Sequence, residues 1–422
     1  MMKRLVIQLA RFGDIVQSKR LILSLRQDGE VHVCVDRSLA SLARLVYPDC
    51  VVHAVPAHSC DARTVLEEGR TIFERLHAER FDEVYTLNNA GLCKAVASLF
   101  PSEIVRGYSV RAGQVQRCRW MRMAFRWMAL RRRSPLNLAD FWAALAPAPL
   151  SPSLVNPPAA PGGKGLGIVP AGQVRRRSAP PEALALLTRI LVERLGGAGK
   201  CPVYLLGTAK EHPVARELMA RLPGTIVETC RDLTGKTDWA ALVDVLSGLD
   251  LLLSPDTGTA HLAAHLGVPV LGLFCSSAWA WETGPYGLGH TILQTDLPCA
   301  PCVESSPCAQ GVPCRAFFTD SDLLAYLAGK GKRARRVPQR VRILHSAFDE
   351  MGQIWREESD SPAHDVPVPH VHSPGTREHD TRMRNALRAQ LAEYLGLGVA
   401  HGTEAAALLY NESDWILPPL KP

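Results

Sequence analysis

Residues 254–274, SPDTGTAHLAAHLGVPVLGLF, decide the fold of this chain. They follow an apolar run at 249–253 and end in a second one at 270–274, and each run has the length of a buried strand. Between the two runs the apolar residues have helical spacing, and Gly267 and Pro269 provide the signals that end a helix. The order strand, turn, helix, strand predicts a βαβ unit of a parallel sheet.

The turn at the start of this helix is rich in polar groups. Ser254, Asp256 and Thr257 can each cap a helix, Gly258 lets another backbone approach closely, and His261 lies in the first turn. A capped crossover without a ligand is the plain alternative, but one helix start cannot use three caps. Because the free N–H groups of a helix N-terminus attract anions, the turn suits a diphosphate that carries a hydroxylated sugar.

The rest of the chain repeats this alternation of strands and helices. Expected strands lie at 3–9, 31–35, 51–55, 81–87, 166–169, 203–206, 249–254 and 270–274. Expected helices lie at 16–26, 38–46, 62–77, 181–195, 211–221, 239–246 and 260–266. The pattern predicts two doubly wound α/β domains, in which ligands bind beyond the carboxyl ends of the strands.

The chain divides into four parts. Residues 146–165 are dense in Pro and Gly, which marks a linker, and after about Gly329 the alternation stops. We therefore expect a first domain at 1–150, a linker at 151–165, a second domain at 166–329, and a basic, proline-rich and poorly ordered tail at 330–422 with a terminal helix at 382–395.

Composition limits the classes of protein that fit. The chain has 422 residues with 47% hydrophobic content, enough for two cores, and its net charge of +7 is too diffuse to identify an acidic partner. No run approaches the roughly 18 apolar residues of a membrane span. In the opening MMKRLVIQLARFGD an acid directly follows a short apolar run, which indicates a first strand and not a signal peptide. Eight of the twelve cysteines are scattered singly, as in a reducing compartment, so we expect a cytoplasmic protein.

Four segments carry a family resemblance. DTGTAHLAAHLGVP at 256–269, VIQLARFGDIVQS at 6–18, IVPAGQVRRRSAPP at 168–181 and PVYLLGTAKEH at 202–212 occur in the order found in glycosyltransferase family 9, the ADP-heptose:lipopolysaccharide heptosyltransferases. The chain resembles that family over roughly residues 1–325. The resemblance implies a GT-B fold, with two Rossmann-like domains facing a cleft, the first binding the acceptor and the second the nucleotide-sugar donor.

The resemblance also implies a mechanism and its residues. The implied mechanism is that of an inverting, metal-independent transferase without a cofactor. Such an enzyme moves a sugar, here heptose from ADP-heptose, to a lipopolysaccharide core or related surface glycan. Asp14 matches the proposed general base, although a cap for the helix that follows is an equally common role for such an aspartate. The residues expected to bind the donor are Arg177, Thr208, Glu211, Asp256, Thr257, Gly258, Thr259 and His261, with Arg175 as a further cation near the diphosphate.

One segment departs from the family pattern. Where the family commonly has Lys-x-Trp-Pro, this chain has Arg177-Ser178-Ala179-Pro180, and Arg and Lys differ in how they bind phosphate. The departure leaves open a second class of protein, a non-catalytic nucleotide-sugar-binding protein on a GT-B fold.

An arginine-rich segment at 106–133 contains no acid and is interleaved with aromatic residues. Basic amphipathic segments of this kind lie on anionic membranes, with nucleic acid as the competing partner and a solvated helix as the plain alternative. We expect Arg117, Arg122 and Arg126 to face an acidic lipid-linked glycan acceptor or the inner-membrane surface. No recognised nucleic-acid-binding motif supports the competing partner.

Four cysteines form a cluster with the spacing C-x2-C-x5-C-x5-C, at Cys299, Cys302, Cys308 and Cys314. The ligand types suit zinc or an iron–sulfur cluster, but the second pair is spaced too widely for a standard zinc ribbon. We expect buried thiols or a redox-sensitive loop and no metal. The close acidic pair at 320–322 opens a helix and is interpreted as a cap.

Overall fold

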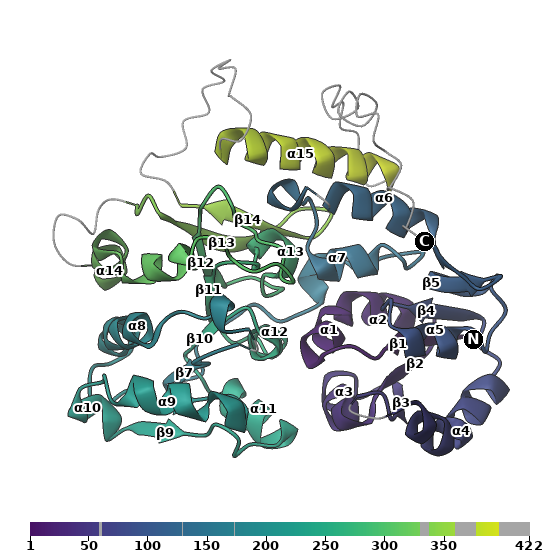
Figure 1. Ribbon diagram of the computed structural model, residues 1–422, viewed down its shortest axis with the longest axis horizontal. Helices are drawn as coiled ribbons and strands as arrows, with labels where there is room; N and C mark the ends of the chain where they lie inside the picture. The colour runs from purple at the N-terminus through teal and green to yellow at the C-terminus, as the bar shows by residue number, and fades with distance from the viewer. Residues whose placement is uncertain (59–60, 129, 173, 330–336, 359–376, 396–422) are drawn as a thin grey trace.

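The computed structural model describes residues 1–58, 61–128, 130–172, 174–329, 337–358 and 377–395. Two parallel-dominated sheets, each covered by helices, form the two halves of the molecule (Figure 1). The alternation of strands and helices read from the sequence is therefore present in both halves.

The first sheet has six strands in the order β3-β2-β1-β4-β5-β6. Its strands are β1 (Met2–Gln8), β2 (Gly29–Asp36), β3 (Val51–Val55), β4 (Glu83–Thr86), β5 (Val105–Arg111) and β6 (Gln114–Arg117). The helices of this half are α1 (Phe12–Gln17), α2 (Lys19–Arg26), α3 (Ala40–Val46), α4 (Ala62–Ala78), α5 (Gly91–Ala97), α6 (Arg119–Met128) and α7 (Leu138–Ala143). Strand β1 pairs in parallel with both β2 and β4, so its carboxyl end lies in the middle of the sheet.

The second sheet has eight strands in the order β14-β13-β12-β11-β10-β7-β8-β9. Its strands are β7 (Leu166–Ile168), β8 (Val203–Leu205), β9 (Cys230–Asp232), β10 (Leu251–Pro255), β11 (Val270–Phe274), β12 (Thr291–Thr295), β13 (Val341–Phe348) and β14 (Gln353–Glu357). The helices are α8 (Pro181–Arg194), α9 (His212–Met219), α10 (Gly224–Val227), α11 (Trp239–Ser247), α12 (Gly258–His265), α13 (Ala280–Thr283) and α14 (Ser321–Ala328). The expected unit of strand, turn, helix and strand is confirmed as β10-α12-β11, with β10 and β11 paired in parallel.

Six of the observed strands were not expected from the sequence: β5, β6, β9, β12, β13 and β14. β13 and β14 lie in the segment assigned to the tail, and they extend the second sheet in the antiparallel direction from β12. The expected terminal helix is present as α15 (Arg377–Tyr394), which lies across both halves (Figure 1). The other parts of the tail, 330–336, 359–376 and 396–422, lie outside the described residues.

The two halves meet at the starts of α1 and α12. A Cβ atom added to Gly13 would lie 3.2 Å from the Cα of Gly258 and 3.3 Å from the ring of His261, and a Cβ on Gly258 would lie 2.2 Å from the ring of Phe12. Glycine is needed at 258 because any side chain there would collide with Phe12. The first turn after β1 and the first turn after β10 are thereby brought into contact.

Candidate active site

Asp14 stands on the first-domain side of this contact. Its carboxylate accepts a hydrogen bond of 3.2 Å from the backbone N–H of the N-cap residue Arg11, so Asp14 helps to cap α1 from the third position of that helix and does not precede the helix as the plain alternative predicted. Burial raises the pKa of Asp14, while the Arg11 backbone and the charge of His261 oppose the rise. A carboxyl group with a raised pKa is a better proton acceptor than an exposed one, so the two roles predicted for Asp14 are compatible.

Asp256 stands on the opposite side and is almost fully covered. Its Oδ2 atom lies 2.5 Å from a guanidinium nitrogen of Arg177 and accepts a hydrogen bond of 2.8 Å from the hydroxyl of Thr283. Its Oδ1 atom lies 3.6 Å from Nε2 of His261. Burial alone would raise the pKa of Asp256, but His261 and Arg177 outweigh that effect and hold it below its ordinary value. Asp256 therefore carries a negative charge that Arg177 balances.

The start of α12 keeps its backbone N–H groups free of side-chain caps. Thr257 is the N-cap residue, yet its side chain makes no capping hydrogen bond and its hydroxyl instead lies 2.9 Å from that of Ser254. Among the described residues, buried Nδ1 of His261 and buried Nε of Arg177 have no hydrogen-bond partner. Arg177 and His261 both contact Asp256, next to the start of α12, and a helix N-terminus beside a cation suits a ligand with anionic oxygens.

Two of the expected donor-binding residues are engaged locally. Glu211 accepts hydrogen bonds from the backbone N–H of Thr208 at 2.7 Å and from its hydroxyl at 2.6 Å, which forms a capping box. Both residues follow β8, whose carboxyl end lies on the same edge of the sheet as those of β7 and β10. Thr208 and Glu211 thus lie at the edge of the sheet where the donor is expected to bind. The carboxylate of Glu211 is hydrogen-bonded within its own turn.

The three arginines in the loop before α8 have different partners. Arg177 pairs with Asp256, and Arg176 donates to the backbone carbonyls of Val303, Glu304 and Ser306, including one bond of 2.8 Å to Val303. Arg175 is exposed. The loop after β7 is therefore attached to the cysteine-rich loop beyond β12.

The arginine-rich segment is a hairpin followed by a helix, and it is not one continuous helix. Arg117 stacks over the rings of Tyr108 and Phe125, at 5.8 and 5.1 Å, and Arg122 is exposed on α6. Arg126 lies in α6, but its side chain is outside the described residues. The last three arginines, residues 131–133, point into the protein, where they form ion pairs. In a surface segment they were expected to point toward solvent.

The cysteine cluster lies beside the second sheet. Cys299 is exposed, Cys302 and Cys308 are half-buried, and Cys314 is buried. A contact with Cys275 lowers the pKa of Cys314 to about 6. In the parts of the chain that the structure describes, no three His, Cys, Asp or Glu side chains are arranged to hold a metal ion.

Two further sequence interpretations can be checked. Asp320 caps α14, accepting hydrogen bonds from the backbone N–H groups of Asp322 and Leu323 at 2.9 and 3.3 Å, so the capping role of this acidic pair is confirmed. No helix within the described ranges is both long enough and apolar enough to cross a bilayer.

Three residues next to the site were missed. Thr283 donates a hydrogen bond to Asp256, and its neighbour Glu282 forms a partly buried ion pair with Arg131 from the other half of the chain. Burial raises the pKa of Glu282, and Arg131 opposes that rise. The partners are separated by 27 and 151 residues, so no local pattern in the sequence could have identified them.

Two doubly wound domains whose polar turns meet at the carboxyl ends of their central strands define the GT-B class of glycosyltransferase fold. The structure of E. coli ADP-heptose lipopolysaccharide heptosyltransferase II has this fold, with a TM-score of 0.54 and 19% identity over 76% of this chain and 98% of that one. E. coli heptosyltransferase WaaC with ADP gives a TM-score of 0.52 at 15% identity, over 70% of this chain and 94% of that one. The expected fold is confirmed.

Residues 188–312 match the model of glycosyltransferase family 9 (heptosyltransferase), which confirms the family resemblance predicted from the sequence. Lipopolysaccharide heptosyltransferase 1 of Pseudomonas aeruginosa is 36% identical over 118 residues, 28% of this chain and 31% of that protein. Lipooligosaccharide heptosyltransferase 2 of Haemophilus influenzae is 35% identical over 72 residues, 17% of this chain and 21% of that protein. The aligned parts thus span about a third or less of these relatives. The residues that match the family model include the α12 turn but neither Asp14 nor Arg177.

Proposed function

We propose that the chain is an inverting glycosyltransferase that moves a sugar, heptose from ADP-heptose, to a lipopolysaccharide core or a related surface glycan. The observation that carries the proposal is the contact between the first turn of α1, with Asp14, and the first turn of α12. The relatives named as lipopolysaccharide heptosyltransferases, and a similar fold solved with ADP, support the choice of donor and acceptor.

On this proposal Asp14 is the general base. It takes the proton of the acceptor hydroxyl as the oxygen attacks the anomeric carbon, and the bond from that carbon to the diphosphate breaks on the opposite face of the sugar. The raised pKa of Asp14 brings its basicity closer to that of an efficient proton acceptor near neutral pH.

The second domain stabilises the departing diphosphate. Developing negative charge would be met by the N–H groups of Gly258 and Thr259 at the start of α12 and by Arg177, whose Nε has no described partner. Asp256 would hold Arg177 in position and orient His261. This structural role would explain why a carboxylate lies next to the proposed diphosphate site. Thr208 and Glu211 would lie on the nucleotide side. The mechanism uses these protein cations and helix N–H groups and calls for no metal or cofactor.

The acceptor side is assigned to the first domain. An acidic lipid-linked glycan would approach over the arginine-bearing face of α6 and the adjacent hairpin, with the protein held peripherally on the inner face of the cytoplasmic membrane. Arg117, Arg122 and Arg126 are the cations proposed for this surface, and Arg122 is exposed.

A second candidate is a nucleotide-sugar-binding protein that lacks turnover. It is favoured by the segment Arg177-Ser178-Ala179, in which the cation next to the donor turn is already paired with Asp256. Such a protein would bind the donor by the same groups and leave Asp14 without a chemical role.

A panel of nucleotide sugars separates the two candidates. Purified protein is titrated with ADP, UDP and their sugar conjugates by calorimetry, and transfer to a lipopolysaccharide acceptor is followed by mass spectrometry. The proposal predicts tighter binding of ADP than UDP and transfer of the ADP-linked sugar with inversion at the anomeric carbon. Binding without transfer to any acceptor would favour the second candidate.

A further inference from the structure

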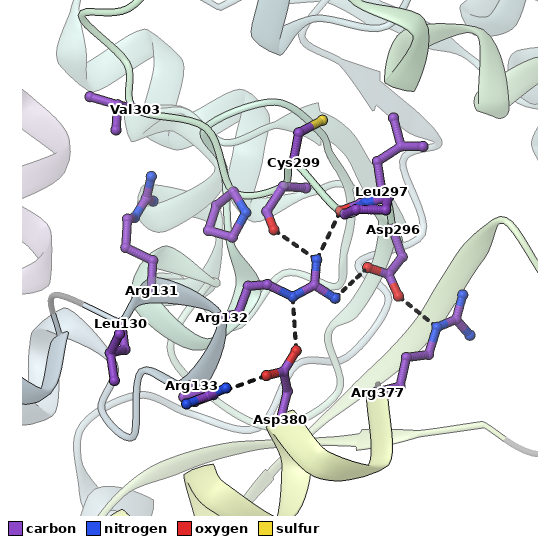
Figure 2. Close-up of a pocket in the computed structure, with 13 residues that line it drawn as sticks. Leu130, Arg131, Arg132, Arg133, Asp296, Leu297, Cys299, Val303, Arg377 and Asp380 are labelled. Atoms are coloured by element: carbon purple, nitrogen blue, oxygen red, sulfur yellow. Dashed lines mark hydrogen bonds and ion pairs between the residues drawn. The ribbon is translucent and has the colours of Figure 1, made fainter. Parts of the chain in front are cut away.

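A pocket of about 790 Å³ lies where three distant segments of the chain meet (Figure 2). Its walls come from the short helix η2 (Arg131–Arg133), the loop at 296–303 and the start of α15. This volume is within the range of about 300–1,000 Å³ that is typical of small-molecule sites.

The lining of the pocket is positively charged. The charged residues are four arginines and two aspartates: Arg131, Arg132, Arg133, Arg377, Asp296 and Asp380. Asp296 pairs with Arg132 and Arg377 at 3.1 and 2.6 Å, and Asp380 pairs with Arg132 and Arg133 at 2.8 and 3.1 Å. Both acids are therefore shared. Arg131 pairs with Glu282 outside the lining, so four cations against the three anions Asp296, Asp380 and Glu282 leave an excess of one positive charge.

Arg133 is the arginine with hydrogen-bond donors to spare. Of its side-chain nitrogens only Nε is hydrogen-bonded to a described residue, Asp380, and its side chain is 22% exposed. The guanidinium of Arg132, in contrast, donates to Asp380, Asp296 and the backbone carbonyls of Leu297 and Ala300. The two terminal nitrogens of Arg133 can thus bind an anion in the paired geometry that guanidinium groups favour.

Apolar residues also line the pocket. Leu130 and Val303 are 42% and 59% exposed, and Leu297 and Pro301 belong to the same lining. A lining that combines arginines with exposed apolar residues is complementary to a molecule with an anionic head and an apolar part.

Two residues that line the pocket, Arg131 and Val303, connect it to the candidate active site. Arg131 holds Glu282, whose neighbour Thr283 holds Asp256. The carbonyl of Val303 accepts a hydrogen bond of 2.8 Å from Arg176, next to Arg177 in the chain. A ligand in the pocket would therefore touch the same loops that position the donor-binding cation.

We propose that this pocket binds the anionic group of the lipid-linked sugar acceptor. A phosphate or carboxylate of the acceptor lies on Arg133, and the apolar part of the molecule lies over Leu130 and Val303. The inference rests on the proposed function, and it adds a subsite for the charge of the acceptor. The opposing account is that the arginines serve only to fasten α15.

Cys299 provides a direct readout, because it lines the pocket and is exposed. Alkylation of Cys299 by iodoacetamide is followed by peptide mass spectrometry in the presence of inorganic phosphate, a sugar monophosphate or a neutral sugar. Both phosphates are expected to slow alkylation and the neutral sugar is not. Failure of both phosphates to protect Cys299 would overturn the proposal.

The matched variants are Arg133→Ala, Arg133→Lys and, as a control on a distant exposed helix, Arg70→Ala. Arg133→Ala should weaken protection about tenfold or more, the size of a lost charge-assisted hydrogen bond, Arg133→Lys less, and Arg70→Ala not at all. The melting temperature should change little, because Arg132 still holds Asp380. Unaltered protection in Arg133→Ala would mean that the arginines only fasten α15.

Three further measurements assign the source and keep the two proposals apart. The sugar monophosphate should compete with the acceptor and not with the nucleotide sugar; competition with the donor alone would contradict the assignment. Protection of Cys299 by phosphatidylglycerol vesicles, without protection by either soluble phosphate, would assign the pocket to membrane lipid and overturn the proposal that it binds the acceptor. ADP binding without phosphate protection contradicts only the pocket, and phosphate protection without ADP binding contradicts only the proposed donor chemistry.

Discussion

Arg177 and Asp256 form an ion pair of 2.5 Å, in which the two side chains are only 16% and 7% exposed. The pair joins the loop after β7 to the turn that starts α12, so it fixes the geometry of the proposed donor site. Because both charges are largely removed from water, each depends on the other.

Arg177→Ala is expected to destabilise the protein. The change leaves the charge of Asp256 buried without its main partner, and the free energy of unfolding should fall by about 3 kcal/mol. Urea unfolding of this variant and of the double variant Arg177→Ala, Asp256→Ala tests the coupling. The double variant should lose less stability than the sum of the two single variants; additive losses would show that the pair is not coupled.

The pH dependence of transfer should report Asp14. Since burial raises its pKa, the acidic limb of the kcat profile should lie above the value of 3.8 usual for an aspartate, with the rate rising with pH and levelling off once Asp14 is ionised. Rates measured at constant ionic strength, with ADP affinity measured in parallel, would check this. A limb at the ordinary aspartate value would mean that Asp14 is not the group being titrated.

A partly buried lysine between the two halves should affect stability at high pH. The ammonium of Lys19 lies 2.8 Å from both Asn156 Oδ1 and His265 Nδ1, and burial lowers its pKa from 10.5 to about 8. Between these pH values the unfolded chain holds a proton that the folded chain has released. The contribution of Lys19 to the free energy of unfolding therefore rises as pH increases from about 8 toward 10.5.

Lys19→Met removes this titration. The difference in stability between the wild type and Lys19→Met should move in favour of the wild type as the pH rises through that range. Denaturant unfolding at several pH values measures the difference directly. A difference independent of pH would show that Lys19 is solvated and titrates normally.

The arginine surface around α6 should contribute to binding of anionic vesicles. Arg117→Glu with Arg122→Glu reverses two charges there, while Arg63→Glu with Arg70→Glu makes the same change on α4. Sedimentation with phosphatidylglycerol vesicles should fall for the first variant only, and high salt should weaken binding of the wild type. Equal sedimentation of both variants would mean that the arginine surface is a solvated face and does not bind the membrane.

Some elements of the fold could be predicted from the sequence and others could not. The β10-α12-β11 unit was predictable because its strands, its turn and the glycine that ends its helix are local signals. β13 and β14 were not, because they follow a long departure from the alternation: β13 pairs antiparallel with β12, and β14 is the edge strand that pairs antiparallel with β13. Their stability comes from an existing sheet, and a sequence pattern does not display that partner.

The basic run at Arg131–Arg133 illustrates the same limit in the site. Its composition suggested a surface, yet its partners Glu282, Asp296 and Asp380 are supplied from 151 to 248 residues further along the chain. The residue types of the donor turn were identifiable from spacing, whereas the pairing of Asp256 with Arg177 and Thr283 required the fold.

The central claim is that Asp14 takes the proton of the acceptor, and Asp14→Asn tests it most directly. Asparagine retains the shape and the ability to cap α1 but cannot accept a proton. Burial raises the pKa of Asp14, so ionising it at neutral pH costs stability, and the amide removes that cost. Asp14→Asn should therefore be at least as stable as the wild type at pH 7.

The decisive measurement is the single-turnover rate of sugar transfer by Asp14→Asn, with ADP affinity and melting temperature measured on the same preparation. The proposed mechanism predicts a fall in rate of about a hundredfold to ten-thousandfold, with ADP affinity unchanged and no loss of melting temperature. Transfer at a near-normal rate by the folded variant would contradict it, because Asp14 would then be only a helix cap.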